Sequence, residues 1–380
     1  MPDNKSFMNS PLFLPIVMAG SLIVSAALPI LMKAIPSWKQ RYDEWSSASS
    51  QKLNLNSSLH DKLKKALSDV KGQDKALSSI VSSICGWSES KNNKLDSGSG
   101  GLVIHMAGVS GTGKSMTANI LTNQLSKESA LRISYSSIDT TDKRSCAEQL
   151  FGSYTKKSSF NTDVKCNTWY AAQLLHNPEV VVQIDEFDKF MMRDDSLQAM
   201  LWDVADTGRL RIDKDTYIDC SRTIFILTSN ASKESLKIKF DKTKNKDDSD
   251  SLESVNFKQA FLNRITSVYF ENFTEDLYKE ILLQKLKPIK DYYSKNYGIK
   301  IEFSDDTLSK ISKELFGMKT GGARNIGIFT RKIYTALNSF RRENSISELS
   351  NEERSSKLSG KFKYNLNIFY KDGAFEIIKK

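Results

Sequence analysis

The sequence predicts an α/β protein in which a parallel sheet carries helices on both faces. An N-terminal transmembrane helix precedes this sheet, and a small, mainly helical domain follows it. Three observations lead to this prediction. Apolar runs alternate with helical patterns from residue 102 to 229, helical patterns dominate from residue 274, and an uncharged apolar run lies near the N-terminus. In open sheets of parallel strands joined by helices, ligands bind outside the carboxyl ends of the strands. We therefore expect the ligand site of this protein there.

The N-terminal apolar run, LFLPIVMAGSLIVSAALPILM, is long enough to cross a bilayer as a helix at about 1.5 Å per residue. It lies within residues 6–32, which contain no charged side chain. We therefore predict an N-terminal tail at 1–10, a transmembrane helix at 11–36 and a polar, serine-rich tether at 37–60. A cleaved signal peptide is the alternative, because the letters VSAA offer small residues at a candidate processing site.

Positive charges near this run predict its orientation. Lys33, Lys39 and Arg41 follow the run, whereas Lys5 and the amino terminus precede it. By the positive-inside rule, the large C-terminal part would lie in the cytoplasm. We therefore expect a single-pass membrane protein whose main domain is cytoplasmic.

The first predicted domain, residues 61–272, begins with helical spacing and then alternates strands with helices. Its predicted strands are 102–108, 131–137, 180–184 and 223–229. The helices expected between them are 114–125, 168–175 and 197–204. Residues 231–256 are rich in Lys, Asp and Ser, which is typical of an exposed, charged insertion.

The second predicted domain, residues 273–380, is mainly helical and ends in strands. Its predicted helices are 274–295, 304–316 and 323–343. Two strand-like segments, 363–370 and 374–380, flank an Asp-Gly pair, which favours a hairpin.

The octapeptide GVSGTGKS directly follows the strand at 102–108 and has the spacing of a phosphate-binding loop. Its glycines let backbone N–H groups wrap around phosphates, and the helix that begins near Lys114 adds its positive end. Lys114 would reach the β- and γ-phosphates of ATP, and Ser115 would ligate Mg²⁺. The predicted nucleotide-binding residues are Gly108, Val109, Ser110, Gly111, Thr112, Gly113, Lys114, Ser115 and Asp185.

The segment VVVQIDEFDK places two carboxylates at the end of an apolar strand. Asp185 would hold Mg²⁺ together with Ser115, and Glu186 would orient and polarise the attacking water. By itself, such a pair of acids also marks an ordinary solvated strand end. Asn230, after the strand TIFILTS, would fix the same water with its amide; the alternative for Asn230 is a turn or a helix cap.

These motifs occur in order with VKGQDKAL upstream and with GRL, ILTSN, FLNRI and GGARNI downstream. From about residue 58 to the C-terminus the sequence resembles the AAA+ superfamily, specifically the C-terminal ATPase module of the Clp chaperone and unfoldase family. The resemblance implies a P-loop AAA+ fold that hydrolyses ATP. It also implies that Arg264 is an arginine finger, which reaches the ATP of the next subunit, and that Arg324 is a second sensor arginine on the lid domain. A guanidinium in either place would stabilise the charge of phosphoryl transfer.

The same resemblance implies a homo-oligomeric ring, typically a hexamer, that unfolds, extracts or remodels protein substrates through loops in its channel. Residues 150–160, LFGSYTKKSSF, occupy the place of such a loop. They depart from the family pattern, since position 157 is Lys, with Tyr154 and Phe160 on either side. The proline and glutamate that the family has before its finger are Gln259 and Ala260 here. Together with the apolar run, these features predict a membrane-anchored AAA+ ATPase that acts on proteins at a membrane surface.

Composition disfavours several other classes of function. The formal charge is +10, but lysine is spread along the chain without a basic run beside a nucleic-acid module, so nucleic acid is not the favoured partner. The four cysteines form no C-x-x-C pair and the three histidines form no H-E-x-x-H motif, which disfavours a zinc site or a disulfide framework. Two alternatives remain open: a torsin-like lumenal ATPase, and a nucleotide-controlled scaffold or nucleic-acid motor.

Overall fold

The computed structural model describes most of the chain beyond residue 52. The described residues are 53–56, 58–93, 100–126, 130–152, 168–212, 217–232, 257–318, 321–350, 362–371 and 373–380. Five predicted segments lie wholly or largely outside them: the tail 1–10, the transmembrane helix 11–36, tether residues 37–52, loop residues 153–160 and insertion residues 233–256. Within the described ranges, no helix combines the length and apolar character that crossing a membrane requires.

The described chain divides into two compact units. Phe270 is the last residue of the first unit, and Glu271 begins the main part of the second. Two short segments, Lys71–Gln73 and Val109–Gly113, pack with the second unit although they come earlier in the sequence. The units are described separately below.

The first unit is built on a five-stranded parallel sheet with the strand order β2-β3-β6-β1-β7. The strands are β1 (Leu102–Gly108), β2 (Leu131–Ile133), β3 (Val181–Ile184), β6 (Ile224–Thr228) and β7 (Thr266–Phe270). All residues of β3 and β6 are buried, as expected for central parallel strands that are covered on both faces.

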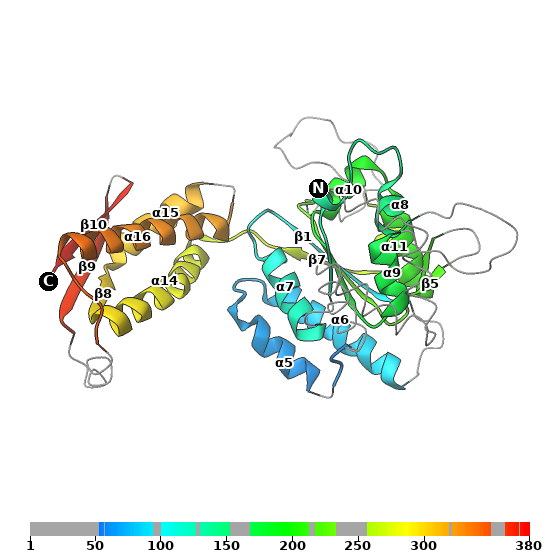
Figure 1. Cartoon of the computed structure of the whole chain (residues 1–380), viewed down its shortest axis with the longest axis horizontal. Coiled ribbons are helices and arrows are strands. Elements are labelled where there is room, and N and C mark those ends of the chain that lie inside the picture. The colour runs from blue at the N-terminus through cyan, green and yellow to red at the C-terminus, as the bar shows by residue number, and fades with distance from the viewer. Residues whose placement is uncertain are drawn as a thin grey trace, which may run out of the picture. The chain divides into compact units, whose positions relative to one another are not determined.

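Helices cover both faces of this sheet (Figure 1). One face carries α5 (Leu59–Ala66), α6 (Asp74–Asn93) and α7 (Lys114–Leu125). The other carries α8 (Cys146–Phe151), α9 (Trp169–His176), α10 (Phe187–Arg193), α11 (Ser196–Thr207) and α13 (Gln259–Leu262). Alternate residues of β6 serve the two cores, with Ile224 and Ile226 on one face and Phe225 and Leu227 on the other. The predicted parallel sheet with helices on both faces is confirmed.

Shorter elements complete the first unit. The 3-10 turns are η1 (Leu67–Asp69) and η3 (Tyr135–Ser137). Strands β4 (Arg209–Arg211) and β5 (Tyr217–Asp219) form a two-stranded antiparallel ribbon directly after α11.

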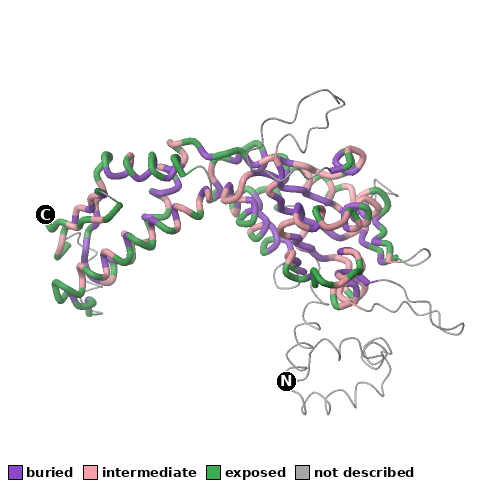
Figure 2. Tube along the Cα trace, turned by 90° about the horizontal axis from the view of Figure 1, so that it is seen from above, coloured by how far each residue is buried: buried purple, intermediate pink, exposed green. Residues whose placement is uncertain are grey.

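The second unit combines three helices with a small sheet. The helices are α14 (Glu275–Tyr297), α15 (Asp305–Gly317) and α16 (Ala323–Glu343). The sheet has the order β10-β9-β8, from β8 (Ile299–Phe303), β9 (Tyr364–Lys371) and β10 (Ala374–Lys379). Helix α16 buries one stripe at helical spacing, Ile326, Phe329, Ile333 and Leu337, and exposes its other side (Figure 2).

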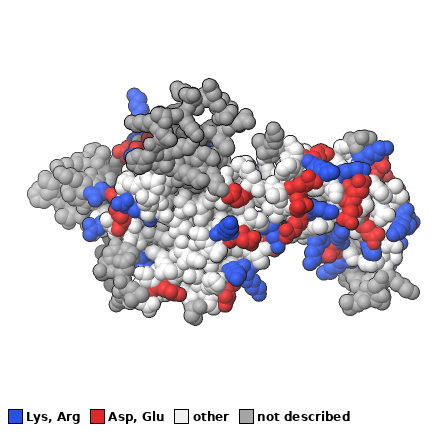
Figure 3. Space-filling view, turned by 180° about the vertical axis from the view of Figure 1, so that it is seen from behind, with Lys and Arg blue, Asp and Glu red and all other residues white. Residues whose placement is uncertain are grey.

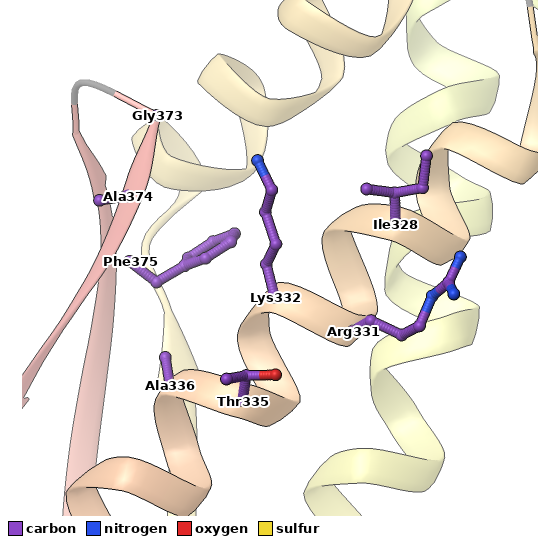
Figure 4. Close-up of a pocket in the computed structure, with 8 residues that line it drawn as sticks. All are labelled: Ile328, Arg331, Lys332, Thr335, Ala336, Gly373, Ala374 and Phe375. Atoms are coloured by element: carbon purple, nitrogen blue, oxygen red, sulfur yellow. The ribbon is translucent and has the colours of Figure 1, made fainter.

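A groove of about 500 Å³ opens between α16 and β10 in this unit. Figure 4 shows Phe375 pointing from β10 towards α16, with Lys332 beside it. The groove is lined by Ile328, Arg331, Lys332, Thr335, Ala336, Gly373, Ala374 and Phe375. None of the residues predicted to bind nucleotide lines it.

The bounds differ from the expected ones in a few places. The predicted strand 131–137 is wrong beyond Ile133, because Ser134 and Ser137 form a reciprocal capping box that turns the chain into η3. The sequence patterns missed β7 and β8, which lie beside longer helical patterns. Helix α14 continues through Pro288 as predicted.

Candidate active site

The phosphate loop connects the central strand β1 to α7. Gly108 has φ 142°, and a Cβ atom there would lie 2.5 Å from the carbonyl oxygen of Phe270, so only glycine fits. The hydroxyl of Thr112 donates to the carbonyl of Val109 at 2.8 Å and closes the loop. The loop therefore turns tightly into the N-terminus of α7, where N–H groups point away from the helix.

Two side chains at the start of α7 have the chemistry that a nucleotide requires. The ammonium of Lys114 lies 2.6 Å from the carbonyl oxygen of Gly108, so it is directed back along the loop. Ser115 is exposed, and the first turn of α7 holds no acidic residue to oppose an incoming phosphate. A basic group and a hydroxyl thus lie where the loop ends.

Asp185 lies at the same edge of the sheet, and strand register explains why. Ile184 pairs with Leu227 and Met106 pairs with Thr228, so the ends of β3, β6 and β1 are level. The hydroxyl of Thr228 donates to Asp185 Oδ1 at 2.9 Å. This bond and one other fix the carboxylate, whose oxygens retain lone pairs for the water shell of a metal ion.

The second bond to Asp185 comes from Gln183, whose Nε2 donates to Oδ2 at 3.0 Å. Gln183 is itself held by Thr122 of α7 and Arg132 of β2, each 3.2 Å from its Oε1. The sequence analysis missed this support. The available signal was a polar residue in the apolar run VVVQI, two positions before Asp185 and therefore on the same face of the strand.

Glu186 occupies a strained position between β3 and α10. Its φ of 59° and ψ of 44° are left-handed, which costs a non-glycine residue roughly 1–2 kcal/mol. Its carboxylate accepts a hydrogen bond from the ammonium of Lys189 at 2.7 Å. Sequence reasoning missed Lys189, although its spacing of three residues on a helix places it beside Glu186.

Asn230 follows β6 at the same edge and is half-buried. The phosphate loop after β1, Asp185 and Glu186 after β3, and Asn230 after β6 are therefore brought together by three adjacent parallel strands. This is the carboxyl edge, where ligands bind in open α/β sheets.

Arg264 lies elsewhere. It precedes β7, whose first residue, Thr266, is in register with Ile104. Ile104 is four residues before Gly108, so β7 begins about 13 Å from the phosphate-loop end of the sheet. The structure does not bring Arg264 to the nucleotide edge of its own chain.

Arg324 belongs to the second unit and is the second residue of α16. In that unit the amide of Ala323 donates to the carbonyl of Gly111 at 2.9 Å. Arg324 thus follows directly after a residue that contacts Gly111 within the second unit.

A buried histidine lies beneath the site. His105 of β1 has its Nε2 2.7 Å from the hydroxyl of Ser229, the residue before Asn230, and its ring packs 4.9 Å from that of Phe257. Burial, reinforced by the positive charge of Lys114, lowers the pKa of His105 from 6.5 to about 3. His105 is therefore neutral at physiological pH and supports the end of β6 as a hydrogen-bonding group.

The comparisons with known proteins agree with this geometry. Residues 101–268 match the family model described as AAA domain (Cdc48 subfamily). "Chaperone protein ClpB" of Prochlorococcus marinus is 29% identical over 169 residues, which are 42% of this chain and 19% of that protein. "Chaperone protein ClpB" of Bacteroides thetaiotaomicron is 27% identical over 147 residues, 36% of this chain and 17% of that protein.

The chain carries a Clp-like AAA+ ATPase module. The resemblance predicted from its motifs is confirmed, and so is its assignment as an ATPase. The solved structure of the S. cerevisiae Hsp104-ADP complex aligns with 83% of this chain and with 51% of the Hsp104 chain. The TM-score is 0.54 and the sequence identity is 19%, so this likeness supports the fold of the AAA+ module. The chain spans about a fifth of the length of the curated relatives it matches.

The neutral state of His105 predicts how stability depends on pH. Between pH 6.5 and about 3 the unfolded chain binds a proton at this position and the folded chain does not, so stability falls as the pH falls through this window. Between pH 7 and pH 5 the loss from this one group is about 2 kcal/mol. In His105→Gln this contribution is absent.

The measurement is the free energy of unfolding in urea at pH 7 and pH 5 for both proteins. His60→Gln, which removes an exposed histidine, is the control and should keep the wild-type loss. An equal loss in wild type and His105→Gln would contradict the buried, neutral state.

Proposed function

We propose that this chain is one subunit of an oligomeric ring, a hexamer by resemblance to its family, that hydrolyses ATP to unfold, extract or remodel protein substrates. One observation carries the proposal: the phosphate loop, Asp185, Glu186 and Asn230 share one edge of the sheet, while Arg264 lies away from it. A module with its finger away from its own nucleotide edge is suited to supply that finger to a neighbour.

The residues present fit Mg²⁺ and ATP. Ser115 offers an exposed hydroxyl beside the loop, and Asp185 offers a carboxylate held by hydrogen bonds from two neutral side chains, Gln183 and Thr228. Ser115 and Asp185 would hold Mg²⁺, which would supply positive charge that stabilises the charge developing on the phosphates. The loop N–H groups and Lys114 would bind the phosphates.

Glu186 would orient the attacking water and polarise it, and Asn230 would fix the water from the neighbouring strand. The hydrogen bond between Lys189 and Glu186 holds the carboxylate in one place, and it competes with the water for that carboxylate. Arg324, at the start of α16, would add positive charge to the phosphates when they are bound.

Protein substrates are supported by the family and by the surface. The matched relatives are named chaperones. In Figure 3 lysine and arginine are interspersed with aspartate and glutamate over the described part of the face shown, rather than gathered into one basic stripe. Such mixing does not favour a nucleic-acid backbone as partner.

We further propose that residues 11–36 anchor the ring in a membrane, with the ATPase module in the cytoplasm. Support comes from the uncharged run 6–32 and from the positive residues Lys33, Lys39 and Arg41 after it. The tether 37–60 would then set the distance between the ring and the membrane surface.

Glu186→Gln should bind ATP normally and hydrolyse it at least ~100-fold more slowly, because the amide cannot polarise the water. The measurement is steady-state turnover alongside binding of a fluorescent ATP analogue. Glu376→Gln removes an exposed carboxylate of β10 and should turn over ATP at the wild-type rate. Normal turnover in Glu186→Gln would overturn the role given to Glu186.

Turnover by the full chain should rise several-fold when a permanently unfolded protein is added, as expected of an ATPase that works on protein chains. Tyr154→Ala should lose this stimulation and keep the basal rate, because Tyr154 lies in the predicted channel loop. Salt-sensitive stimulation by DNA or RNA in place of the unfolded protein would favour the nucleic-acid motor instead.

The full chain expressed in cells should sediment with membranes and resist extraction by high salt and by alkaline carbonate. A chain that starts at residue 46 should be released into the soluble fraction. If the full chain is released in the same way, or is recovered shortened at its N-terminus, the anchor is wrong and the signal-peptide alternative gains support.

A further inference from the structure

Helix α11 contacts both ends of the segment 258–264, which carries Arg264. At one end the backbone N–H of Lys258 donates to Gln198 Oε1 at 3.1 Å, and its ammonium lies 2.5 Å from Asp195 Oδ2. At the other end the side chain of Arg264 lies against the last two turns of the same helix. The short helix α13, between these two points, is therefore fixed along the length of α11.

Among the described residues, the side chain of Arg264 makes three contacts. Its Nε donates to Asp206 Oδ1 at 2.9 Å, and its NH1 donates to the carbonyl of Ala260 at 2.7 Å. Its central carbon lies 5.0 Å from the centre of the Trp202 ring. Two hydrogen bonds and one ring thus define the position and the plane of a group that carries five N–H donors.

Orientation, rather than stability, is the main effect of this arrangement. The side chains of Arg264 and Asp206 are 37% and 47% exposed, and exposed ion pairs add little to folding. Asp206 also lies in the last turn of α11, where a negative charge opposes the helix dipole. The pair leaves the guanidinium accessible to a neighbouring molecule while restricting its rotamers.

We propose that Asp206 and Trp202 are positioning residues that fix the guanidinium of Arg264 for the ATP of the neighbouring subunit. This inference rests on the proposed function, in which Arg264 acts in trans. A group that stabilises phosphoryl transfer must be placed within a fraction of an ångström, and a free arginine side chain has too many rotamers to stay there. The bond to Asp206 restricts the direction of the Arg264 side chain, and the contact with Trp202 restricts the orientation of the guanidinium plane.

The test is ATP turnover by full-chain Asp206→Ala. The rate constant kcat should fall about ten-fold, because a finger displaced by about 1 Å loses much of its effect. The KM for ATP should change little, because the nucleotide edge of each subunit is intact. Trp202→Leu should act in the same direction.

Asp203→Ala is the matched control. Asp203 lies one turn earlier on α11 and pairs with Arg211 at 3.3 Å, so the change removes another exposed ion pair of the same helix that does not involve Arg264. Its turnover should stay within two-fold of wild type. In the Arg264→Ala background, Asp206→Ala should cause no further loss, because it acts through Arg264.

Mixing subunits separates positioning from damage to the protein's own site. A Glu186→Gln subunit keeps a normal finger and an inactive site, whereas an Asp206→Ala subunit keeps a normal site and a poorly placed finger. Turnover per Asp206→Ala subunit should therefore rise when the two are mixed. The mixture of Arg264→Ala with Glu186→Gln should show the same rise.

The results of the two mixing experiments distinguish the positioning role of Asp206 from the role of Arg264 in trans. If the Arg264→Ala mixture recovers turnover and the Asp206→Ala mixture does not, the positioning role is wrong and the finger stands. Faster turnover in Asp206→Ala would also overturn it, since the pair would then restrain the finger. If neither mixture recovers turnover, or if Arg264→Ala hydrolyses ATP normally, the finger in trans is wrong and this inference fails with it.

Discussion

The pairing of β6 with both β1 and β3 is the constraint on which the candidate site depends. Each pair is parallel, and the registers place Thr228 level with Met106 and just beyond Leu227, the partner of Ile184. The backbone N–H of Ser229 extends the ladder by donating to the carbonyl of Met106 at 3.0 Å. A slip of one residue would turn Thr228 to the other face and remove its bond to Asp185. The ladder therefore fixes which polar groups meet at the edge.

The two ends of the strands in this sheet carry different predicted site residues. The carboxyl edge collects the phosphate loop and the acidic residues, whereas the segment before β7 carries Arg264 at the amino end of that strand. Polar groups inside the sheet support this division. Gln183 is held by side chains from α7 and β2, and His105 lies beside Ser229 at the end of β6. Both are buried and paired, as a low-dielectric core requires.

Sequence patterns correctly predicted the starts of helices that are set by neighbouring residues in the chain. Helix α7 begins at Lys114 and α16 begins at Ala323, as their glycine-rich approaches indicated. Strand β7 was missed because only Val268 and Phe270 of its five residues are buried, and an edge strand of this kind gives little periodicity. The contact between Asp206 and Arg264 joins residues 58 positions apart, so it follows from packing rather than from local sequence. The positions of the phosphate loop, the two acidic residues and Asn230 could be predicted because the spacing of their motifs implies strand ends.

Two packed helices, α10 and α11, join the segment that carries Arg264 to the edge of the sheet that carries Glu186. Helix α10 begins directly after Glu186, and α11 follows it through a corner at Asp194. That corner is tied to the start of α8, since the N–H of Cys146 donates to Asp194 at 2.9 Å and the N–H of Ala147 donates to Ser196 at 3.1 Å. Helix α11 in turn contacts Arg264 through Asp206 and Trp202. Helices α10 and α11 therefore connect the turn at Glu186 to the surface that carries Arg264.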